Sequence, residues 1–470
     1  MRAAKATAMA VLTAAVLAGC GNGSDANGKD GADPAATGGD KALATMTLPP
    51  AYDAGKGWDE TLPWVPGEAD EPPVAVLPRA AAVALLTLDD SAGFALRTKA
   101  ADTGKDRWTS AAWHPPTPMD DARSEGEIPA VLGYEQDGRE YVVLSAHGMT
   151  GKDALHDGTE VVRLAVYAAD GEGTGRKPLR EIDVPVDAEE NEWRVSADGG
   201  RLLVAYGEHG RYPSRSVAVD VATGRMTRYE NPNDLLNGQC ENKPYECGWS
   251  RVVAVGAKGP LVGLGHGFSV PGVWTSEDVR PEGAAPSPPG GLSFDTNGDV
   301  YGVAGGRFLA QWHGPERNGS SGPTEWSVHD IATGAVLARM ECAYEAFPSK
   351  GVEGHSREYP VVTSPSGRFL AAGPVTFDVE RKQGVCLQGD GNAKTVAVES
   401  VADDGTAYGK VDGDASAEVF ARLDLTTKTG DAKVLDAGVE IPLHTGVAGA
   451  GLFVVRDQHE NLRVSLRAAR

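Results

Sequence analysis

Two short turn signatures alternate along the chain from about residue 74, and this alternation constrains the fold more than any other feature. The first signature is a Ser/Asp/Gly turn that precedes a short apolar run. Ser196–Gly199 precedes Leu202–Ala205, and Ser364–Gly367 precedes Phe369–Ala371. Looser copies lie at Glu135–Gly138, Asp295–Gly298 and Ala402–Gly405.

The second signature is Asp-x-x-Thr-Gly, which follows an apolar run. It occurs at Asp220–Gly224 and Asp330–Gly334, and variants lie at Ala101–Gly104, Gly173–Gly175 and Thr427–Gly430. In both signatures the glycine supplies the positive φ of a tight hairpin, and the Asp or Ser oxygen accepts hydrogen bonds from the turn amides. Both signatures therefore predict hairpins.

The runs between these turns are short and β-branched, so they predict strands. Grouped in fours, they form modules of about 30–55 residues, which is typical of an all-β fold of the β-propeller type. We place the modules at 74–113, 128–187, 190–230, 249–279, 291–341, 357–388 and 394–436. Residues 443–469 form a partial module, which we expect to pair with the first and close the ring. The division predicts seven blades, with eight as the alternative.

Two segments resemble known propeller repeats. Phe94–Trp108 resembles the repeat of quinoprotein-like propellers, in which a strand, an Asp-x-x-Thr-Gly turn and a docking tryptophan follow in order. Ser364–Ala371 resembles the turn of WD-repeat propellers. The resemblance covers about residues 74–469 and implies a propeller fold. It also brings pyrroloquinoline quinone into consideration, but many such dehydrogenases place adjacent cysteines beneath that cofactor and this chain has none. We therefore expect no cofactor.

The first 19 residues have the parts of an export signal. Arg2 and Lys5 give a positive start, and Ala6–Ala18 is an uncharged apolar run, too short to span a bilayer at about 1.5 Å per residue. Leu17–Cys20 resembles the lipobox of bacterial lipoproteins. The resemblance implies that Cys20 is diacylated and anchors the protein to the outer face of the cytoplasmic membrane. The alternative is an ordinary secretory peptide with an incidental cysteine.

Residues 20–73 read as a lipidated, mostly disordered tether. Gly21–Asp25 and Gly31–Pro34 offer nothing to bury and cannot offset the entropy lost on ordering. Tyr52–Trp64 holds two tryptophans, and for this stretch docking on the domain is the alternative. The propeller itself is then expected over residues 74–470.

The charge balance excludes one class of partner. The chain carries 44 basic and 66 acidic side chains, and without Arg2 and Lys5 the difference between 42 and 66 is −24. A nucleic-acid partner requires basic patches, so we expect none. The acidic surface is instead typical of a soluble, solvated domain.

Four cysteines follow Cys20, an even number that suits an oxidising compartment. Cys240 and Cys247 enclose a polar turn sequence and are expected to form one disulfide. Cys342 and Cys386 would then form the second. Four cysteines allow three pairings, and the other two remain alternatives.

No catalytic or metal motif is present. Gly267–Gly272 approaches a nucleophile elbow but is one residue too long. The ten histidines are scattered without metal-ligand spacing. We therefore favour a non-catalytic binding or scaffolding propeller that contacts a protein, peptide or glycan. The alternative is an extracytoplasmic hydrolase or lyase with a carboxylate/His site at the central mouth.

Loop lengths suggest which face binds. In a blade whose strands run up and down, the first-to-second and third-to-fourth turns share one face, and here these turns are tight. The long connections fall on the other face: 146–158, 208–214, 231–248, 277–290, 306–325 and 342–357. Functional residues concentrate on such loops. The candidate contact residues are His209, Tyr212, His266, Trp312, His313 and His355.

Overall fold

In the residues that it describes, the computed structural model consists of largely antiparallel β-sheets and a short 3-10 helix, Pro232–Leu236. It describes residues 43–67, 69, 71–89, 93–117, 128–187, 193–207, 214–236, 250–264, 267–285, 298–314, 323–346, 359–390, 392–413 and 418–470. Cys20, Cys240 and Cys247 lie outside these residues.

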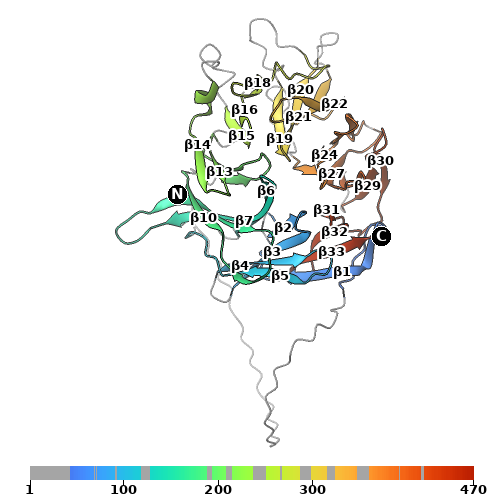
Figure 1. The fold of residues 1–470 in the computed structure, drawn as a ribbon. Coiled ribbons are helices and arrows are strands. Elements are labelled where there is room, and N and C mark those ends of the chain that lie inside the picture. Colours follow the sequence, from blue (N-terminus) through green and yellow to red (C-terminus); the bar gives the residue numbers. More distant parts are fainter. Residues whose placement is uncertain are drawn as a thin grey trace, which may run out of the picture. The chain divides into compact units, whose positions relative to one another are not determined.

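The strands form eight sheets, which we call blades 1 to 8 in the order of their innermost strands (Figure 1). Blade 1 contains β2 (Val74–Leu77), β3 (Ala82–Leu88), β4 (Phe94–Ala100) and β5 (Asp106–Ser110), and blade 2 contains β6 (Ala130–Gln136), β7 (Arg139–Thr150), β8 (Thr159–Ala168) and β10 (Arg180–Pro185). Blade 3 contains β11 (Trp193–Ser196), β12 (Leu202–Tyr206), β13 (Arg215–Asp220) and β14 (Arg225–Tyr229), and blade 4 contains β15 (Arg251–Gly256), β16 (Gly259–Gly263), β17 (Phe268–Val270) and β18 (Trp274–Thr275).

The second half of the chain repeats this plan. Blade 5 contains β19 (Asp299–Ala304), β20 (Arg307–His313), β21 (Thr324–Asp330) and β22 (Val336–Glu341), and blade 6 contains β23 (Val361–Thr363), β24 (Phe369–Ala372), β25 (Val375–Asp378) and β26 (Gln383–Cys386). Blade 7 contains β27 (Val396–Val401), β28 (Thr406–Val411), β29 (Phe420–Asp424) and β30 (Asp431–Val434), and blade 8 contains β31 (His444–Val447), β32 (Ala450–Arg456), β33 (Leu462–Ala469) and β1 (Tyr52–Leu62).

The blades follow one another in sequence order and close a ring, in which blade 3 contacts β15 through β12 and β13. β2 contacts β6 on one side and β31 on the other, and β15, β19, β23, β27 and β31 follow one another in contact. Blades 2 and 3 are joined by buried hydrogen bonds, in which Gln136 donates to the Asp220 carboxylate at 3.0 Å and accepts from the amide of Val221 at 3.1 Å. The chain is therefore an eight-bladed β-propeller.

The predicted count of seven blades is wrong, and the alternative of eight is confirmed. Residues 443–469 do not complete the first module; they supply three strands of blade 8. The fourth strand is β1, which pairs antiparallel with β33 in the register Trp58↔Leu466. This pairing joins residues about 400 positions apart, so no local pattern could reveal it.

β1 lies in the segment 20–73, which the sequence placed in the tether. The described residues before it also pack on the ring: Met46 and Leu48 lie against a buried cluster of Tyr52, Tyr408 and Phe453 at blades 7 and 8. The propeller therefore begins well before residue 74. β1 is an outermost strand with charges and glycines, and five of its eleven residues are exposed, which explains why the segment resembles a tether in composition.

The turn chemistry follows the predicted pattern. The Asp220 carboxylate accepts the amide of Thr223 at 3.0 Å, and the Asp330 carboxylate accepts the amide of Thr333 at 2.8 Å. Gly224 and Gly334 take positive φ values of 79° and 71°. Residues 173–175, in contrast, do not close a simple hairpin: they belong to β9 (Gly173–Arg176), which leaves blade 2 and adds a fifth, parallel strand to blade 1 beside β5.

The expected disulfide Cys342–Cys386 is confirmed, with its Cα atoms 5.4 Å apart. Cys342 follows β22 and Cys386 ends β26, so the bond links the outermost strands of blades 5 and 6.

Candidate functional site

The two ends of the blades define two faces. We call the face with the first-to-second and third-to-fourth turns the tight-turn face, and the opposite one the long-loop face. The amide of Gly306, in the β19–β20 turn, donates to the carbonyl of Asp198, in the β11–β12 turn, at 3.1 Å. Trp312 lies near the other end of β20, so Asp198 is at the tight-turn end of its blade and Trp312 is near the long-loop end.

Trp312, a predicted contact residue, belongs to the core. Its side chain is fully buried and its indole N–H donates to Ser327 Oγ at 2.7 Å. The segment 306–325 is not one long loop, because residues 307–313 form β20 and pair with β19 on one side and β21 on the other, and β21 begins at Thr324. Trp312 therefore cannot contact a partner without opening blade 5, and it is not a contact residue.

The other candidates are distributed as follows. His313 ends β20 and is partly exposed, with its carbonyl accepting the amide of Ala285 at 2.8 Å. His209, Tyr212, His266 and His355 lie outside the described residues. Of the six candidates, the structure therefore describes only the neighbours Trp312 and His313, and it does not assemble them with other candidates into a site.

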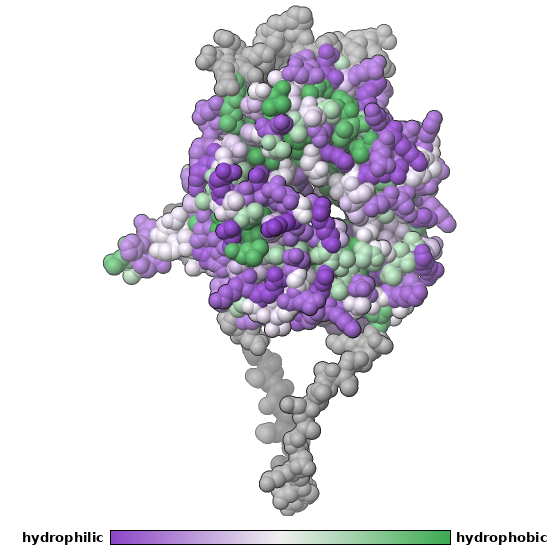
Figure 2. All heavy atoms as spheres, viewed as in Figure 1, coloured by the Kyte–Doolittle hydropathy of each residue, from purple (hydrophilic) through white to green (hydrophobic). Residues whose placement is uncertain are grey.

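The connection 146–158 also differs from a simple loop. β7 continues to Thr150 and β8 begins at Thr159, so the two strands form a long hairpin on the long-loop face. At its end the Asp153 carboxylate accepts the amides of Leu155 at 2.7 Å and His156 at 2.9 Å. These bonds hold the pKa of Asp153 below its ordinary value. Leu155 is 89% exposed, and Figure 2 shows apolar surface at the tip of the hairpin.

One histidine–carboxylate pair lies on the long-loop half of blade 2. His147 Nε2 is 2.6 Å from Glu160 Oε1, and the imidazole packs at a tilt against Trp193 of blade 3, with ring centroids 5.4 Å apart. Both residues are on the middle strands β7 and β8, away from the central mouth. Ser145, two residues before His147, is buried with its hydroxyl unpaired and does not form a relay with the imidazole. The pair therefore reads as a packing contact between blades.

A second histidine network is wholly internal. Ser327 Oγ lies 2.7 Å from His329 Nε2, and His329 Nδ1 lies 3.0 Å from the carbonyl of Gly334. Burial lowers the pKa of His329 to about 4, so the ring is neutral at physiological pH. With Trp312 donating to the same serine, the network satisfies buried polar groups in blade 5.

Two carboxylates with raised pKa values, Asp198 and Glu399, occur singly on the inner part of the ring. Burial alone raises the pKa of Asp198 to about 6, with no charged group contributing. Burial also raises the pKa of Glu399 in blade 7, while Lys410 opposes the shift. These two groups are on different blades, so they do not form an acid–base pair. Within the described ranges, no cluster of three His, Cys, Asp or Glu side chains could hold a metal ion.

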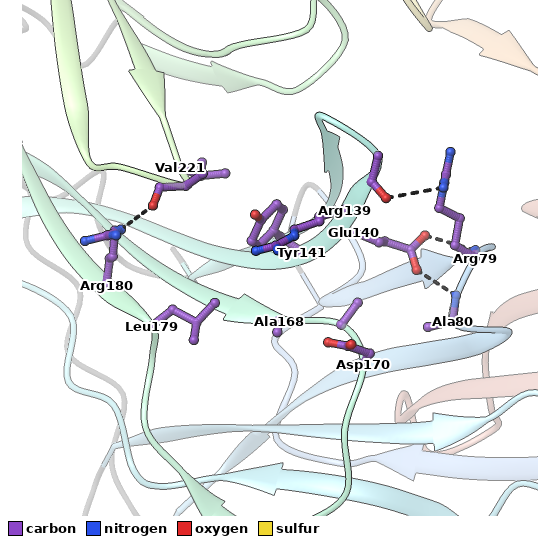
Figure 3. A pocket seen from close by; sticks show the side chains of 13 residues that line it. Arg79, Ala80, Arg139, Glu140, Tyr141, Ala168, Asp170, Leu179, Arg180 and Val221 are labelled. Atoms are coloured by element: carbon purple, nitrogen blue, oxygen red, sulfur yellow. Dashed lines mark hydrogen bonds between the residues drawn. The ribbon is translucent and has the colours of Figure 1, made fainter.

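A groove of about 760 Å³ crosses blade 2 on the tight-turn face (Figure 3). Three blades contribute to it: the β2–β3 turn of blade 1, the β6–β7 turn and the β8–β10 connection of blade 2, and the β13–β14 turn of blade 3. Its charged and exposed apolar side chains are Arg79, Arg139, Glu140, Asp170, Leu179 and Arg180. Sequence reasoning missed the groove because these residues come from turns far apart in the chain.

Hydrogen bonds fix both ends of the groove. The Glu140 carboxylate accepts the amides of Arg79 at 3.1 Å and Ala80 at 2.8 Å, and Arg79 Nε donates to Glu135 at 2.7 Å. Burial raises the pKa of Glu140, and the two amide bonds oppose the shift. At the other end, Arg180 Nε donates to the carbonyl of Ala222 at 2.9 Å. The groove is therefore held across three blades.

The described part of the chain contains no helix with the length and apolar character of a membrane span.

Comparison with known proteins yields structural similarity alone. No protein-family model matches the chain, and no curated protein matches it. Among solved structures, it is similar to Porphyromonas gingivalis dipeptidyl peptidase 4, with 8% identity, a TM-score of 0.36 and coverage of 83% of this chain but 56% of the peptidase. It is also similar to U3-55K (9% identity, TM-score 0.35, 87% and 98% covered) and to the WD40 repeats of RRP9 (10%, 0.36, 90% and 99%).

Proposed function

We propose that this protein is an exported binding propeller, anchored by a lipid at Cys20 to the outer face of the cytoplasmic membrane, that contacts a protein, peptide or glycan through its long-loop face. The observation that supports the proposal best is the β7–β8 hairpin, whose tip holds Leu155 out in solvent on the long-loop side.

The tip is ordered before any partner arrives. Besides the two amide bonds to Asp153, the amide of Asp153 donates to the carbonyl of His156 at 3.0 Å, and His156 Nδ1 lies 2.8 Å from the Asp153 carboxylate. An exposed apolar side chain on an ordered turn loses little conformational entropy when it is buried by a partner. Burying one leucine side chain contributes about 1.5–3 kcal/mol.

The confirmed disulfide agrees with export, because disulfides form and persist in oxidising compartments. The anchor has a direct test. Cys20→Ala in the full chain should abolish incorporation of a labelled fatty acid and leave the protein uncleaved or released from the membrane. A variant that still carries the label in the membrane fraction would show that Cys20 is not the lipidation site.

The binding face is tested by site-specific photo-cross-linking in the producing cell. A photoreactive residue at Leu155 should yield a discrete higher-mass adduct, whereas one at Met226, 40% exposed beside the β13–β14 turn on the tight-turn face, should not. Leu155→Asp, introduced together with a photoreactive residue at His156, should remove the adduct without changing the melting temperature. Equal adducts from positions 155 and 226, or none from 155, would contradict the proposed face.

A further inference from the structure

We infer that the groove on the tight-turn face is a second binding site, and that its ligand is an extended peptide segment with a carboxylate side chain next to an aliphatic one. This site goes beyond the proposed function, because it lies on the face opposite the β7–β8 hairpin.

The charge of the groove contrasts with that of the chain. The whole protein has a formal net charge of −22, yet three guanidinium groups line this groove against two carboxylates. One of the two, Glu140, already accepts two backbone amides. Cations concentrated in a hollow of an acidic protein favour an anionic ligand there.

Two of the guanidinium groups have donors to spare. Across the described ranges, no hydrogen bond or ion pair engages the side chain of Arg139, which is exposed at the groove. Arg180 is oriented by the bond from its Nε to Ala222, which leaves its terminal nitrogens for a ligand. An arginine offers paired donors that match the two oxygens of a carboxylate.

The β8–β10 connection supplies the apolar part of the site. Leu179 is 57% exposed and precedes Arg180, so an aliphatic group placed on it lies beside a guanidinium. Figure 3 places Asp170 on the same connection, and in the described structure no partner engages its carboxylate. A backbone amide or a cationic group of the ligand would complement this carboxylate, which a peptide provides and a simple anion does not.

The wall is rigid because blade 1 holds it. The indole of Trp108 donates to the carbonyl of Ala169 at 3.1 Å, and the Arg176 guanidinium lies over the Trp108 ring, 5.0 Å from its centroid. Arg176 also donates to the carbonyl of Asp170 at 2.6 Å. The parallel pairing of β9 with β5 extends this contact along blade 1. A preorganised wall reduces the entropic cost of ligand binding.

An acidic peptide is favoured over an acidic glycan by the side chains present. Sugar rings commonly pack their C–H faces on exposed aromatic rings, and the aromatic residue of this groove, Tyr141, is only 4% exposed. The exposed apolar group is instead the aliphatic side chain of Leu179.

The test uses the full chain purified in detergent and capped, fluorescently labelled heptapeptides with one Glu between two Leu residues, measured by fluorescence anisotropy. Matched peptides carry Gln or Lys in place of Glu. We expect the Glu peptide to bind about tenfold more tightly than the Gln peptide, as a charge-assisted Arg–carboxylate contact predicts. Raising the salt from about 50 to about 500 mM should reduce this preference by screening.

Variants locate the site. Arg139→Gln and Arg180→Gln should each lower the preference for Glu, and the double variant should abolish it. Arg225→Gln is the matched control, because Arg225 is exposed on the same face in β14, outside the groove. Equal binding of the Glu and Gln peptides, no binding up to about 1 mM, or an equal loss in Arg225→Gln would overturn the inference. So would Arg139-dependent binding of a trigalacturonate in place of the peptides. None of these outcomes bears on the Leu155 cross-link.

Discussion

Arg467, in the last strand of the chain, donates a hydrogen bond of 2.7 Å to the carboxylate of Asp59, in the first strand, across 408 positions of sequence. The guanidinium is fully buried and also donates to the carbonyl of Trp58 at 3.0 Å. Ser465 Oγ and the amide of Ala44 also donate hydrogen bonds to the same carboxylate, at 2.5 and 2.7 Å. This cluster of hydrogen bonds joins the first and last strands of the propeller and holds the residues just before β1 against blade 8.

Removing one partner of this pair should strongly destabilise the ring. Asp59→Asn leaves the Arg467 charge buried without its counter-ion, and such a change costs about 3–5 kcal/mol. Chemical denaturation of the variant and the wild type measures the loss. Asp53→Asn is the control on the same strand, because its pair with Lys56 is exposed and should contribute less than about 1 kcal/mol. Equal losses of unfolding free energy in the two variants would show that the buried Asp59–Arg467 pair contributes no more to stability than the exposed pair.

The same pair should make stability depend on acid. Burial by itself would raise the pKa of Asp59, but the hydrogen bonds from Ser465, Ala44 and Arg467 outweigh it and lower the pKa. The contribution of the carboxylate is therefore present above its unfolded pKa of about 4 and is lost as the pH falls through its folded pKa. The difference in unfolding free energy between wild type and Asp59→Asn should shrink below about pH 4. A constant difference down to pH 2 would contradict this account.

His329 should add a second acid dependence in a higher pH window. Its folded pKa of about 4 lies below the ordinary value of 6.5, so between these values the unfolded chain binds the extra proton. The free energy of unfolding is therefore not reduced by His329 above about pH 6.5, and it falls by about 3 kcal/mol as the pH drops to 4. His329→Gln should flatten this slope, whereas a change at the exposed His459 should not. Because the variant could fold poorly, an NMR titration of the wild-type ring gives an independent reading, and a pKa near 6.5 would refute the prediction.

The disulfide between blades 5 and 6 should contribute measurably to the free energy of unfolding. It closes a segment with a separation of 44 residues, for which the chain-entropy model gives about 4 kcal/mol. The double variant Cys342→Ser/Cys386→Ser should lose stability in this range. Peptide mapping without reductant checks the bond itself and also the predicted Cys240–Cys247 bond outside the described residues. A double variant as stable as the oxidised wild type would mean that packing alone stabilises the interface between blades 5 and 6.

Two glycines with positive φ offer a matched comparison. At Gly334 (φ 71°) a Cβ would lie 2.3 Å from Val279 and 3.0 Å from the Trp274 ring, whereas at Gly305 (φ 56°) it would meet open space. Gly305→Ala should therefore cost about 1 kcal/mol of backbone strain, and Gly334→Ala should cost at least about 2 kcal/mol more, because the neighbours must shift. Thermal unfolding of both variants measures the difference. Similar melting temperatures would show that the Gly334 turn relaxes.

Local features of this protein could be predicted from its sequence. The turns at Asp220 and Asp330 form as expected because their glycines and carboxylates act within five residues. The propeller fold follows from the strands between such turns, and Cys342 could be paired with Cys386 because the nearby Cys240 and Cys247 were expected to pair with each other. The turns and strands depend on the backbone geometry of short segments, which their residue types determine.

Long-range features were decided by the tertiary structure. The composition of Tyr52–Leu62 suggests a tether, and only its pairing with β33 makes it the fourth strand of blade 8. Trp312 looks like a loop residue until β19 and β21 pair on either side of β20 and bury it. The groove brings Arg79, Arg139 and Arg180 together from separate turns. Periodicity and turn chemistry report a residue's neighbours along the chain, whereas these three results depend on which distant strands the closed ring sets side by side.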